Sequence, residues 1–243
     1  MKVLFIGSGH GVPEPNRKCS CIYLETQGHR YLIDAGTDPT EELIRRGISP
    51  DTIESVFITH MHSDHLNGLI PLISLCSWFY KNVKLNVAMP DLRAVPVFRS
   101  LLEVEGVTLW EGISFSEVKE GLVYEDGTIR VTAFRTGHID RSFAFLVEAE
   151  GKKLLFTGDM KHGTGPVDDY ARFAARDDLD LAVAECAHFN AMLYEEPLLK
   201  HTPKRFCLNH YSWAFIESCY HLKEALKDKV NIFLATDGLE LDI

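Results

Sequence analysis

Short apolar runs alternate with polar, glycine-rich stretches along the first half of the chain, and this pattern predicts strands joined by tight turns. Val3–Ile6 is apolar and ends at a run of glycines, so it predicts a strand followed by a turn. The stretches 20–26 and 31–33 flank Gln27-Gly28, which indicates a hairpin. The chain is therefore expected to open with antiparallel strands.

Helices are expected to follow in the same half. Thr37 or Asp38 can cap a helix whose first turn is acidic and whose last turn carries arginines, a charge order that suits the helix dipole. The stretch Leu66–Tyr80 is strongly apolar and long enough for one buried helix. The other expected elements are strands at Ser55–Ile58 and Val83–Val87 and a helix at Asp91–Val104.

The second half repeats this order. Apolar stretches on both sides of Asp126-Gly127 predict a hairpin, and those around Glu150-Gly151 predict another. The remaining expected elements are a helix at Val167–Ala175, strands at Leu179–Ala184 and Arg205–Leu208, a helix at Ala214–Lys227 and a strand at Asn231–Ala235 that closes the chain.

Both halves thus contain strands, then helices, then further strands, without a linker between them. Two β-rich halves with helices outside favour a mixed α/β fold in four layers, with two sheets face to face and helices on both flanks. The pattern alone leaves this as one of several α/β folds. We expect residues 1–243 to form one domain of two βα halves, about 1–120 and 121–243.

The composition narrows the classes of function. The chain has 243 residues, of which 46% are hydrophobic and 25% charged, as in ordinary globular proteins. The formal net charge is -10, with 25 Lys and Arg against 35 Asp and Glu. Because such a surface repels phosphate backbones, broad electrostatic binding of nucleic acid is disfavoured.

The cysteines and the apolar runs indicate the compartment. The six cysteines show no zinc-ribbon spacing and mostly sit beside apolar residues, so we expect reduced core thiols. The first residues form a strand and turn rather than a signal peptide, and no apolar stretch is long enough to span a membrane. A cytoplasmic location is expected.

The chemistry concentrates where a predicted strand turns into a predicted helix. His60, His62, Asp64 and His65 fall within six residues directly after the strand Ser55–Ile58. His60 and His62 point the same way if the strand continues, because side chains alternate. Imidazole nitrogens and carboxylate oxygens are ligands that suit Zn²⁺, and also Mn²⁺ or Fe²⁺. The alternative, a surface turn that is merely rich in histidine, is much less consistent with this pattern.

Three further candidates follow predicted strands elsewhere. His138, Asp159 and His210 each come just after an apolar strand, where open sheets place their sites. A single histidine in such a place is more often structural. Together with the first cluster, however, these residues provide seven ligands, enough for two metal ions.

At this point the sequence resembles the metallo-β-lactamase superfamily. The resemblance rests on the His-x-His-x-Asp-His motif at 60–65, on the later markers in the expected order, and on Leu32-Ile33-Asp34-Ala35-Gly36. It implies an αββα sandwich of two βα halves. It also implies one metal on His60, His62 and His138, a second on Asp64, His65 and His210, Asp159 as the bridge between them, and Asp34 as a residue that orients the histidine turn.

The details favour one branch of that superfamily. A carboxylate at Asp159 is usual in the tRNA 3′-processing nuclease, in cyclic phosphodiesterases and in glyoxalase-type thioesterases, and is usually lacking in zinc β-lactamases themselves. A histidine at position 62, rather than a carboxylate, argues against the flavo-di-iron branch. The glycine-rich segment Gly7–Pro13 and the segment Ala235–Leu239 resemble parts of the cyclic phosphodiesterase branch.

The resemblance implies a hydrolase in which two metals share a hydroxide that attacks the substrate, with Asp64 helping to orient it. His188 follows another predicted strand; it is either a proton donor to the leaving group or a packing histidine. The expected substrate is a small or cyclic phosphodiester. A thioesterase or lactonase is the alternative; a non-catalytic binding protein or an RNA-processing nuclease is less consistent with the sequence.

The expected partner is a small anionic molecule. Nucleic acid is disfavoured by the acidic excess and by the absence of an insert matching the long glycine-rich arm of the tRNA nuclease. The sequence leaves two questions open: whether the protein forms a homodimer, and whether Cys19 and Cys21 bind an extra metal ion. Further residues to examine near the site are Arg141, Lys161, His162, Tyr211 and Trp213, for each of which a packing or surface role is the simpler interpretation.

Overall fold

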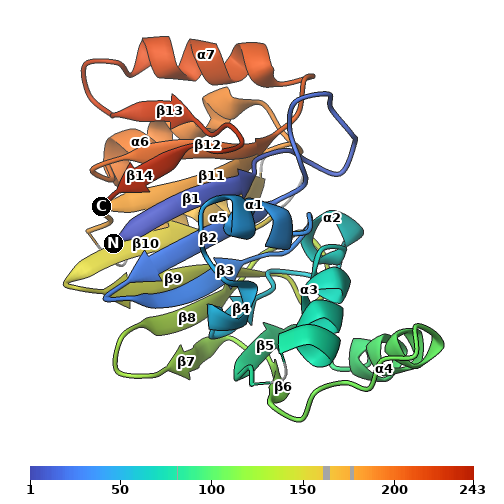
Figure 1. Ribbon diagram of the computed structural model, residues 1–243. Coiled ribbons are helices and arrows are strands. Elements are labelled where there is room, and N and C mark those ends of the chain that lie inside the picture. The colour runs from blue at the N-terminus through green and yellow to red at the C-terminus, as the bar shows by residue number, and fades with distance from the viewer. Residues whose placement is uncertain (81, 161–164, 176–177) are drawn as a thin grey trace.

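Two mixed sheets lie face to face in the computed structural model, which describes residues 1–80, 82–160, 165–175 and 178–243 (Figure 1). The first sheet has the strand order β14-β1-β2-β3-β4-β5-β6. Its strands are β1 (Lys2–Gly7), β2 (Cys21–Thr26), β3 (His29–Ile33), β4 (Ser55–Phe57), β5 (Leu85–Met89), β6 (Ile113–Glu117) and β14 (Glu240–Asp242).

The second sheet repeats this plan with the order β13-β12-β11-β10-β9-β8-β7. In both sheets antiparallel hairpins come first and parallel strands follow, from β3 to β6 and from β10 to β13. The strands are β7 (Gly121–Glu125), β8 (Arg130–Arg135), β9 (Phe143–Ala149), β10 (Lys152–Phe156), β11 (Leu181–Cys186), β12 (Phe206–Tyr211) and β13 (Ile232–Leu234).

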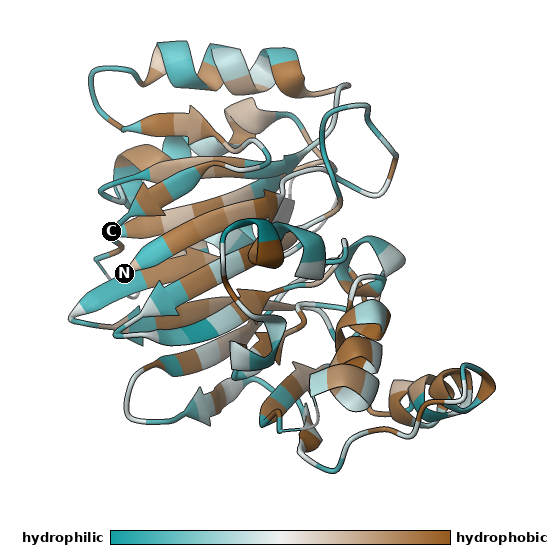
Figure 2. Cartoon of the chain, in the orientation of Figure 1, coloured by the Kyte–Doolittle hydropathy of each residue, from teal (hydrophilic) through white to brown (hydrophobic). Residues whose placement is uncertain are grey.

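Helices cover the outer face of each sheet, and strands and helices bury their apolar faces in three separate clusters. One cluster fills the space between the sheets, and the other two lie between each sheet and its helices. Strand β1 shows the reason: Val3 and Phe5 face the other sheet, whereas Leu4 and Ile6 face the helices. Figure 2 shows the same concentration of hydrophobic residues on the strands. Three apolar interfaces define four layers, so the predicted αββα sandwich is confirmed.

The helices that cover the first sheet belong to its half of the sequence. They are α1 (Thr40–Arg45), the 3-10 turn η1 (Pro50–Thr52), α2 (Ser63–Leu66), α3 (Leu69–Leu75), the π-helical turn η2 (Cys76–Tyr80) and α4 (Ala94–Val104). The second sheet is covered by α5 (Gly165–Ala174), the 3-10 turn η3 (Ala191–Tyr194), α6 (Glu195–Lys200) and α7 (Ile216–Ala225). In the described ranges, no helix combines the length and the apolar character that crossing a bilayer demands.

The predicted hairpins are confirmed. Gln27 and Gly28 both have left-handed φ angles, of 53° and 85°, and Glu150 and Gly151 repeat this with 52° and 70°. Positive φ at both central residues is the turn geometry that matches the twist of paired strands.

Two predictions about elements are wrong. The single helix expected over Leu66–Tyr80 is divided into α2, α3 and η2, with a break at Asn67 and Gly68. At Gly68 the chain approaches another segment so closely that a Cβ atom would lie 1.9 Å from the carbonyl oxygen of Thr37. Residues Asn231–Ala235 do not supply the last strand either, because β14 follows them and pairs antiparallel with β1. Figure 1 accordingly shows the two ends of the chain side by side.

Candidate metal centre

The candidate ligands meet at one edge of the sandwich, where strands of both sheets end. His60 lies just beyond β4, His138 beyond β8 and Asp159 beyond β10. His210 lies within β12, with an unusual left-handed φ of 48°. The fold therefore brings together side chains that are up to 150 residues apart in the sequence.

A first group gathers three imidazoles. His60 Nε2 lies 3.0 Å from His62 Nδ1, and His138 Nε2 lies 3.1 Å from the same atom. Ligand atoms of these three residues and of Asp159 all lie within 4.8 Å of one another. Three nitrogens at this spacing suit one tetrahedral ion, because Zn–N bonds of about 2.0–2.1 Å separate ligand nitrogens by about 3.3 Å.

A second group consists of Asp64, His65 and His210, whose ligand atoms also lie within 4.8 Å of one another. The Nε2 atoms of both histidines are 3.6 Å from Asp64 Oδ2. These distances are close enough for all three side chains to hold one ion.

Asp159 faces both groups at once. Its Oδ1 atom lies 3.3 Å from the Nε2 atoms of both His65 and His210 in the second group. Its Oδ2 atom lies 3.7 Å from His60 Nε2 and 3.6 Å from His138 Nε2 in the first. One carboxylate thus directs one oxygen to each group.

Hydrogen bonds from neighbouring groups fix which ring nitrogens point inward. Asp34 accepts a bond of 2.7 Å from His65 Nδ1 and one of 2.8 Å from the backbone N–H of Thr59. The carbonyl oxygen of Gly9 lies 3.1 Å from His210 Nδ1. Since carboxylate and carbonyl oxygens only accept, both rings carry their proton on Nδ1 and direct the lone pair of Nε2 to the centre.

The chemistry of these groups fits a divalent metal ion. His65 Nε2 and Asp159 Oδ1 are buried and have no hydrogen-bond partner among the described residues, and such orphaned atoms are costly unless something binds them. Burial, reinforced by the neighbouring imidazoles, holds the pKa of His60 far below its ordinary value, which keeps this imidazole neutral. Burial also raises the pKa of Asp159, but the imidazoles of His210 and His65 outweigh this and hold it well below its usual range. A neutral imidazole and an ionised carboxylate are ligands that suit a divalent metal ion.

His188 stands beside this centre. Its Nε2 atom lies 3.7 Å from Asp159 Oδ2, and its Nδ1 atom lies 2.9 Å from Glu185 Oε1. Burial lowers the pKa of His188, but the hydrogen bond and charge of Glu185 outweigh it and raise the value above normal. No role for Glu185 was predicted from the sequence; the spacing Glu-x-x-His at the end of a strand was the signal that could have found it. Asp159, Glu185 and His188 also form a third group that could hold an ion.

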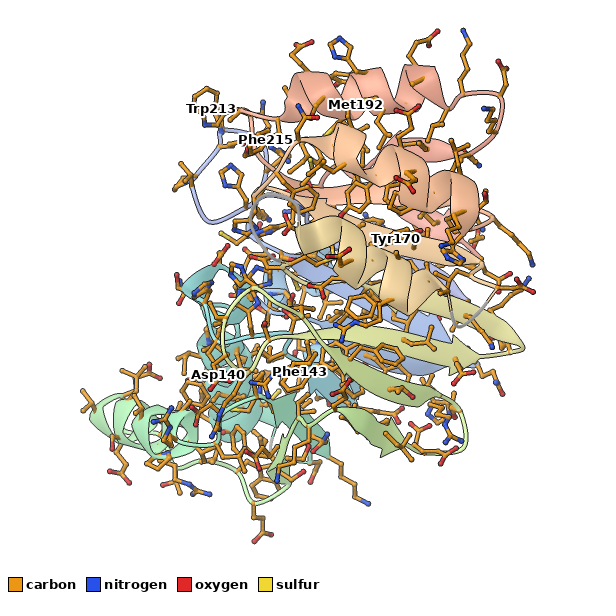
Figure 3. All side chains as sticks on the ribbon, turned by 180° about the vertical axis from the view of Figure 1, so that it is seen from behind. Asp140, Phe143, Tyr170, Met192, Trp213 and Phe215 are labelled. Atoms are coloured by element: carbon orange, nitrogen blue, oxygen red, sulfur yellow. The ribbon has the colours of Figure 1, made fainter. Side chains whose placement is uncertain are left out.

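A cavity of about 440 Å³ opens next to the two groups. It is bordered by ligands from both and, away from them, by His10, Val12, Trp213 and Phe215. Trp213 is 69% exposed and points outward at this end of the molecule (Figure 3). The cavity has the size of a small-molecule site.

Tyr211 and Arg141, also singled out in the sequence, have structural contacts instead. Tyr211 is buried, donates to the carbonyl oxygen of Ala235 and packs under the guanidinium of Arg17, so its role is packing. Arg141 is half exposed and contacts Glu117. Lys161 and His162 lie outside the described residues. All six cysteines are free thiols, and no group of three candidate ligands in the described ranges includes Cys19 or Cys21.

Comparisons with known proteins agree with this geometry. The family model of the anti-Pycsar protein Apyc1 matches residues 1–215. Ribonuclease Z of Listeria monocytogenes serotype 4b is 34% identical over 168 residues, which cover 68% of this chain and 55% of the relative. The chain thus spans about half the length of the curated relatives it matches.

Solved structures identify the fold. The short form of human tRNase Z superposes with a TM-score of 0.74 at 23% identity, covering 100% of this chain and 99% of that one. The metallo-β-lactamase fold protein YhfI from Bacillus subtilis gives 0.78 at 16% identity, covering 99% and 98%. The architecture is therefore the metallo-β-lactamase fold.

Proposed function

Because the chain belongs to the family of the anti-Pycsar protein Apyc1, we propose that it is a metal-dependent hydrolase that cleaves a small or cyclic phosphodiester. The observation that carries this proposal is the position of Asp159, which directs one carboxylate oxygen to each ligand group. A carboxylate that faces both groups can hold two ions close together, and paired ions suit phosphodiester cleavage.

The two ions would be divalent. His60, His62 and His138 would hold one, Asp64, His65 and His210 would hold the other, and Asp159 would contact both. Zinc suits these ligands best, with manganese and iron as alternatives, because imidazole and carboxylate accommodate all three.

The residues of the site have different roles in the proposed reaction. When bound, divalent ions lower the pKa of water and neutralise phosphate charge as the transition state forms. Asp64, at the rim of the cavity, helps to orient the attacking group. His188, held through Nδ1 by Glu185, faces the cavity and delivers a proton to the leaving oxygen.

Charge and size favour a small substrate. The net charge of -10 repels a long polyanion, whereas ions beside Asp64 and Asp159 would reverse the sign of the field locally. The cavity of about 440 Å³ accommodates a small phosphodiester.

RNA is the second candidate substrate. The sequence predicted that nucleic acid is unlikely, and the matches to proteins named ribonuclease Z weaken that expectation. A thioesterase or lactonase of the same fold is a further alternative. We also propose that the protein works in the cytoplasm, which its six free thiols support. A homodimer is likewise part of the proposal.

A substrate panel tests these alternatives. The protein loaded in turn with Zn²⁺, Mn²⁺ and Fe²⁺ is offered bis-p-nitrophenyl phosphate, cyclic nucleotides, a thioester, a lactone and a precursor tRNA. We expect phosphodiester cleavage, and we expect His62→Ala and Asp159→Ala to abolish it and to lower the metal content. Cleavage of the thioester or the tRNA alone would replace the proposal by the corresponding alternative.

A further inference from the structure

The segment Ala235–Leu239, noticed in the sequence for its resemblance to phosphodiesterases, has no part in the function proposed above. In the structure it crosses behind the second ligand group. Asp237 uses both carboxylate oxygens there. Oδ1 accepts from the backbone N–H of Ser8 at 2.9 Å and from its hydroxyl at 2.8 Å, and Oδ2 accepts from the backbone N–H of Lys18 at 2.7 Å. Asp237 therefore joins the glycine-rich loop after β1 to the segment that returns towards β2.

Ser8, which Asp237 holds, and its neighbour Gly9 in turn hold His210. The carbonyl oxygen of Ser8 accepts from the backbone N–H of His210 at 3.0 Å. The carbonyl oxygen of Gly9 accepts from the Nδ1 atom of the same histidine at 3.1 Å. Two hydrogen bonds to the carbonyl oxygens of consecutive loop residues thus fix both the backbone and the ring of His210.

His210 needs this support because its backbone is strained. Its φ of 48° lies in the left-handed region, which is unfavourable for a residue with a side chain and persists only where the surroundings enforce it. Ser8 is fully buried, and the N–H of Gly9 donates to the carbonyl oxygen of Lys18 at 2.7 Å. The glycine-rich loop after β1 therefore keeps its close-packed conformation only as long as the segment around Lys18 stays in place.

We infer that Asp237 is a positioning residue for the second ligand group: through Ser8 and Gly9 it sets the orientation in which His210 presents Nε2 beside Asp64 and His65. This inference rests on the proposed function in so far as that group holds a metal ion. The first group is held differently, since His60 and His62 follow β4 and His138 follows β8. Loss of Asp237 should therefore weaken one ion and spare the other.

The test is a metal titration. Metal-stripped protein is titrated with Zn²⁺ alone against a chromophoric chelator, which reports the affinity of each equivalent without any substrate. For the unmodified chain we expect two equivalents. For Asp237→Ala we expect one unchanged equivalent and one weakened about 10- to 100-fold, the usual effect of losing a group that orients a ligand. His210→Ala provides the reference pattern for a damaged second group, and His138→Ala the pattern for a damaged first group.

Two milder variants keep the test decisive should Asp237→Ala fold poorly. Asp237→Asn keeps an oxygen for Ser8 but sets an amide N–H₂ against the N–H of Lys18, so a smaller loss of the same equivalent is expected. Ser8→Ala removes only the hydroxyl bond and should also affect that equivalent alone. Asp242→Ala is the matched control, because it removes an exposed carboxylate from β14, directly after the segment. Circular dichroism and the Tm of the metal-free proteins show which variants are folded.

The inference is overturned if folded Asp237→Ala, or folded Asp237→Asn and Ser8→Ala, bind two equivalents as tightly as the unmodified chain. Equal weakening of both equivalents would also overturn it, because that result describes general damage to the fold. The proposed function fails separately: a chain that binds two zinc ions yet cleaves no phosphodiester refutes that function and leaves the positioning role intact.

Discussion

Glu185 fixes both His188 and the backbone beside the centre. It is 2% exposed, and it accepts from the backbone N–H of Met160 at 2.9 Å and of Ala187 at 2.8 Å as well as bonding His188. A carboxylate with this many donors is held rigidly, and so is the imidazole that it orients. His188 therefore lies in a fixed position relative to Asp159.

This geometry predicts the effect of removing the imidazole. We expect His188→Ala to lower kcat by about 10²–10⁴-fold, the usual contribution of a proton donor, while both metal equivalents remain. Steady-state kinetics together with metal analysis measure this. His29→Ala, at a half-exposed hairpin position bonded to Glu54, is the control and should change neither quantity. Loss of a metal equivalent from His188→Ala would instead identify His188 as a ligand.

The sequence pointed to the direct ligand candidates and to one supporting residue, Asp34, but it gave no role to Glu185 or Asp237. His60, His62, Asp64 and His65 are crowded within six residues, so their spacing alone is informative. The Glu-x-x-His spacing of Glu185 and the resemblance of the segment around Asp237 are weak local signals, because the contacts of both carboxylates join segments far apart in the chain. The left-handed backbone of His210 was not predictable from the sequence either, because contacts with the distant residues Ser8 and Gly9 support it.

Among the elements, the break between α2 and α3 has the clearest physical cause. Gly68 has an ordinary helical φ of -77°, so conformational freedom does not explain it. A Cβ atom there would meet the backbone of Thr37 at 1.9 Å, and the Gly68 N–H donates to the carbonyl oxygen of Ala35 at 2.6 Å. The loop before α1 is thus packed directly on the break.

Gly68→Ala should therefore destabilise the fold. We expect a loss of about 1–3 kcal/mol in the free energy of unfolding, because backbone cannot yield as a flexible side chain does. Urea denaturation followed by circular dichroism measures this loss. Asn67→Ala, one residue earlier, is the control and should cost less. An unchanged midpoint for Gly68→Ala would mean that the loop shifts freely.

Elements with strong local signals were predictable, and those that depend on distant partners were not. The hairpins at Gln27-Gly28 and Glu150-Gly151 are predictable because the two turn residues alone favour the turn. Strand β14 is only three residues long, with the polar ends Glu240 and Asp242, and exists because β1 offers a free edge. The apolar run Leu66–Tyr80 has helical character throughout, but its division depends on packing against Thr37.

At the scale of the whole molecule, one turn bonds the two sheets together far from the metal centre. Asp126, in the β7–β8 turn of the second sheet, accepts from the hydroxyl of Tyr31 in the first sheet at 2.6 Å. It also accepts from the backbone N–H groups of Thr128 and Ile129. Burial raises the pKa of Asp126, but these hydrogen bonds outweigh it and leave the value below normal.

A carboxyl whose pKa is lowered in the folded state stabilises it above the unfolded pKa, and this contribution is lost as the pH falls through the folded pKa. We expect Asp126→Asn to cost about 1 kcal/mol at pH 7, a modest value because solvent screens the exposed turn. The difference should begin to shrink as the pH falls below about 4, the ordinary carboxyl value, and should be lost only below the lower pKa of the folded state. Denaturation at several pH values measures it; a constant difference would show that the charge plays no part.

Each ligand group takes members from both sheets. The first combines His60 and His62 from the β4 side with His138 from the β8 side, and the second combines Asp64 and His65 with His210 from β12. An ion in either group would therefore act as a cross-link, closing long loops of chain much as a disulfide does. Such cross-links restrict the unfolded chain most when the loop is long. The centre would then resist separation of the two layers, and its loading would contribute to keeping the sandwich closed.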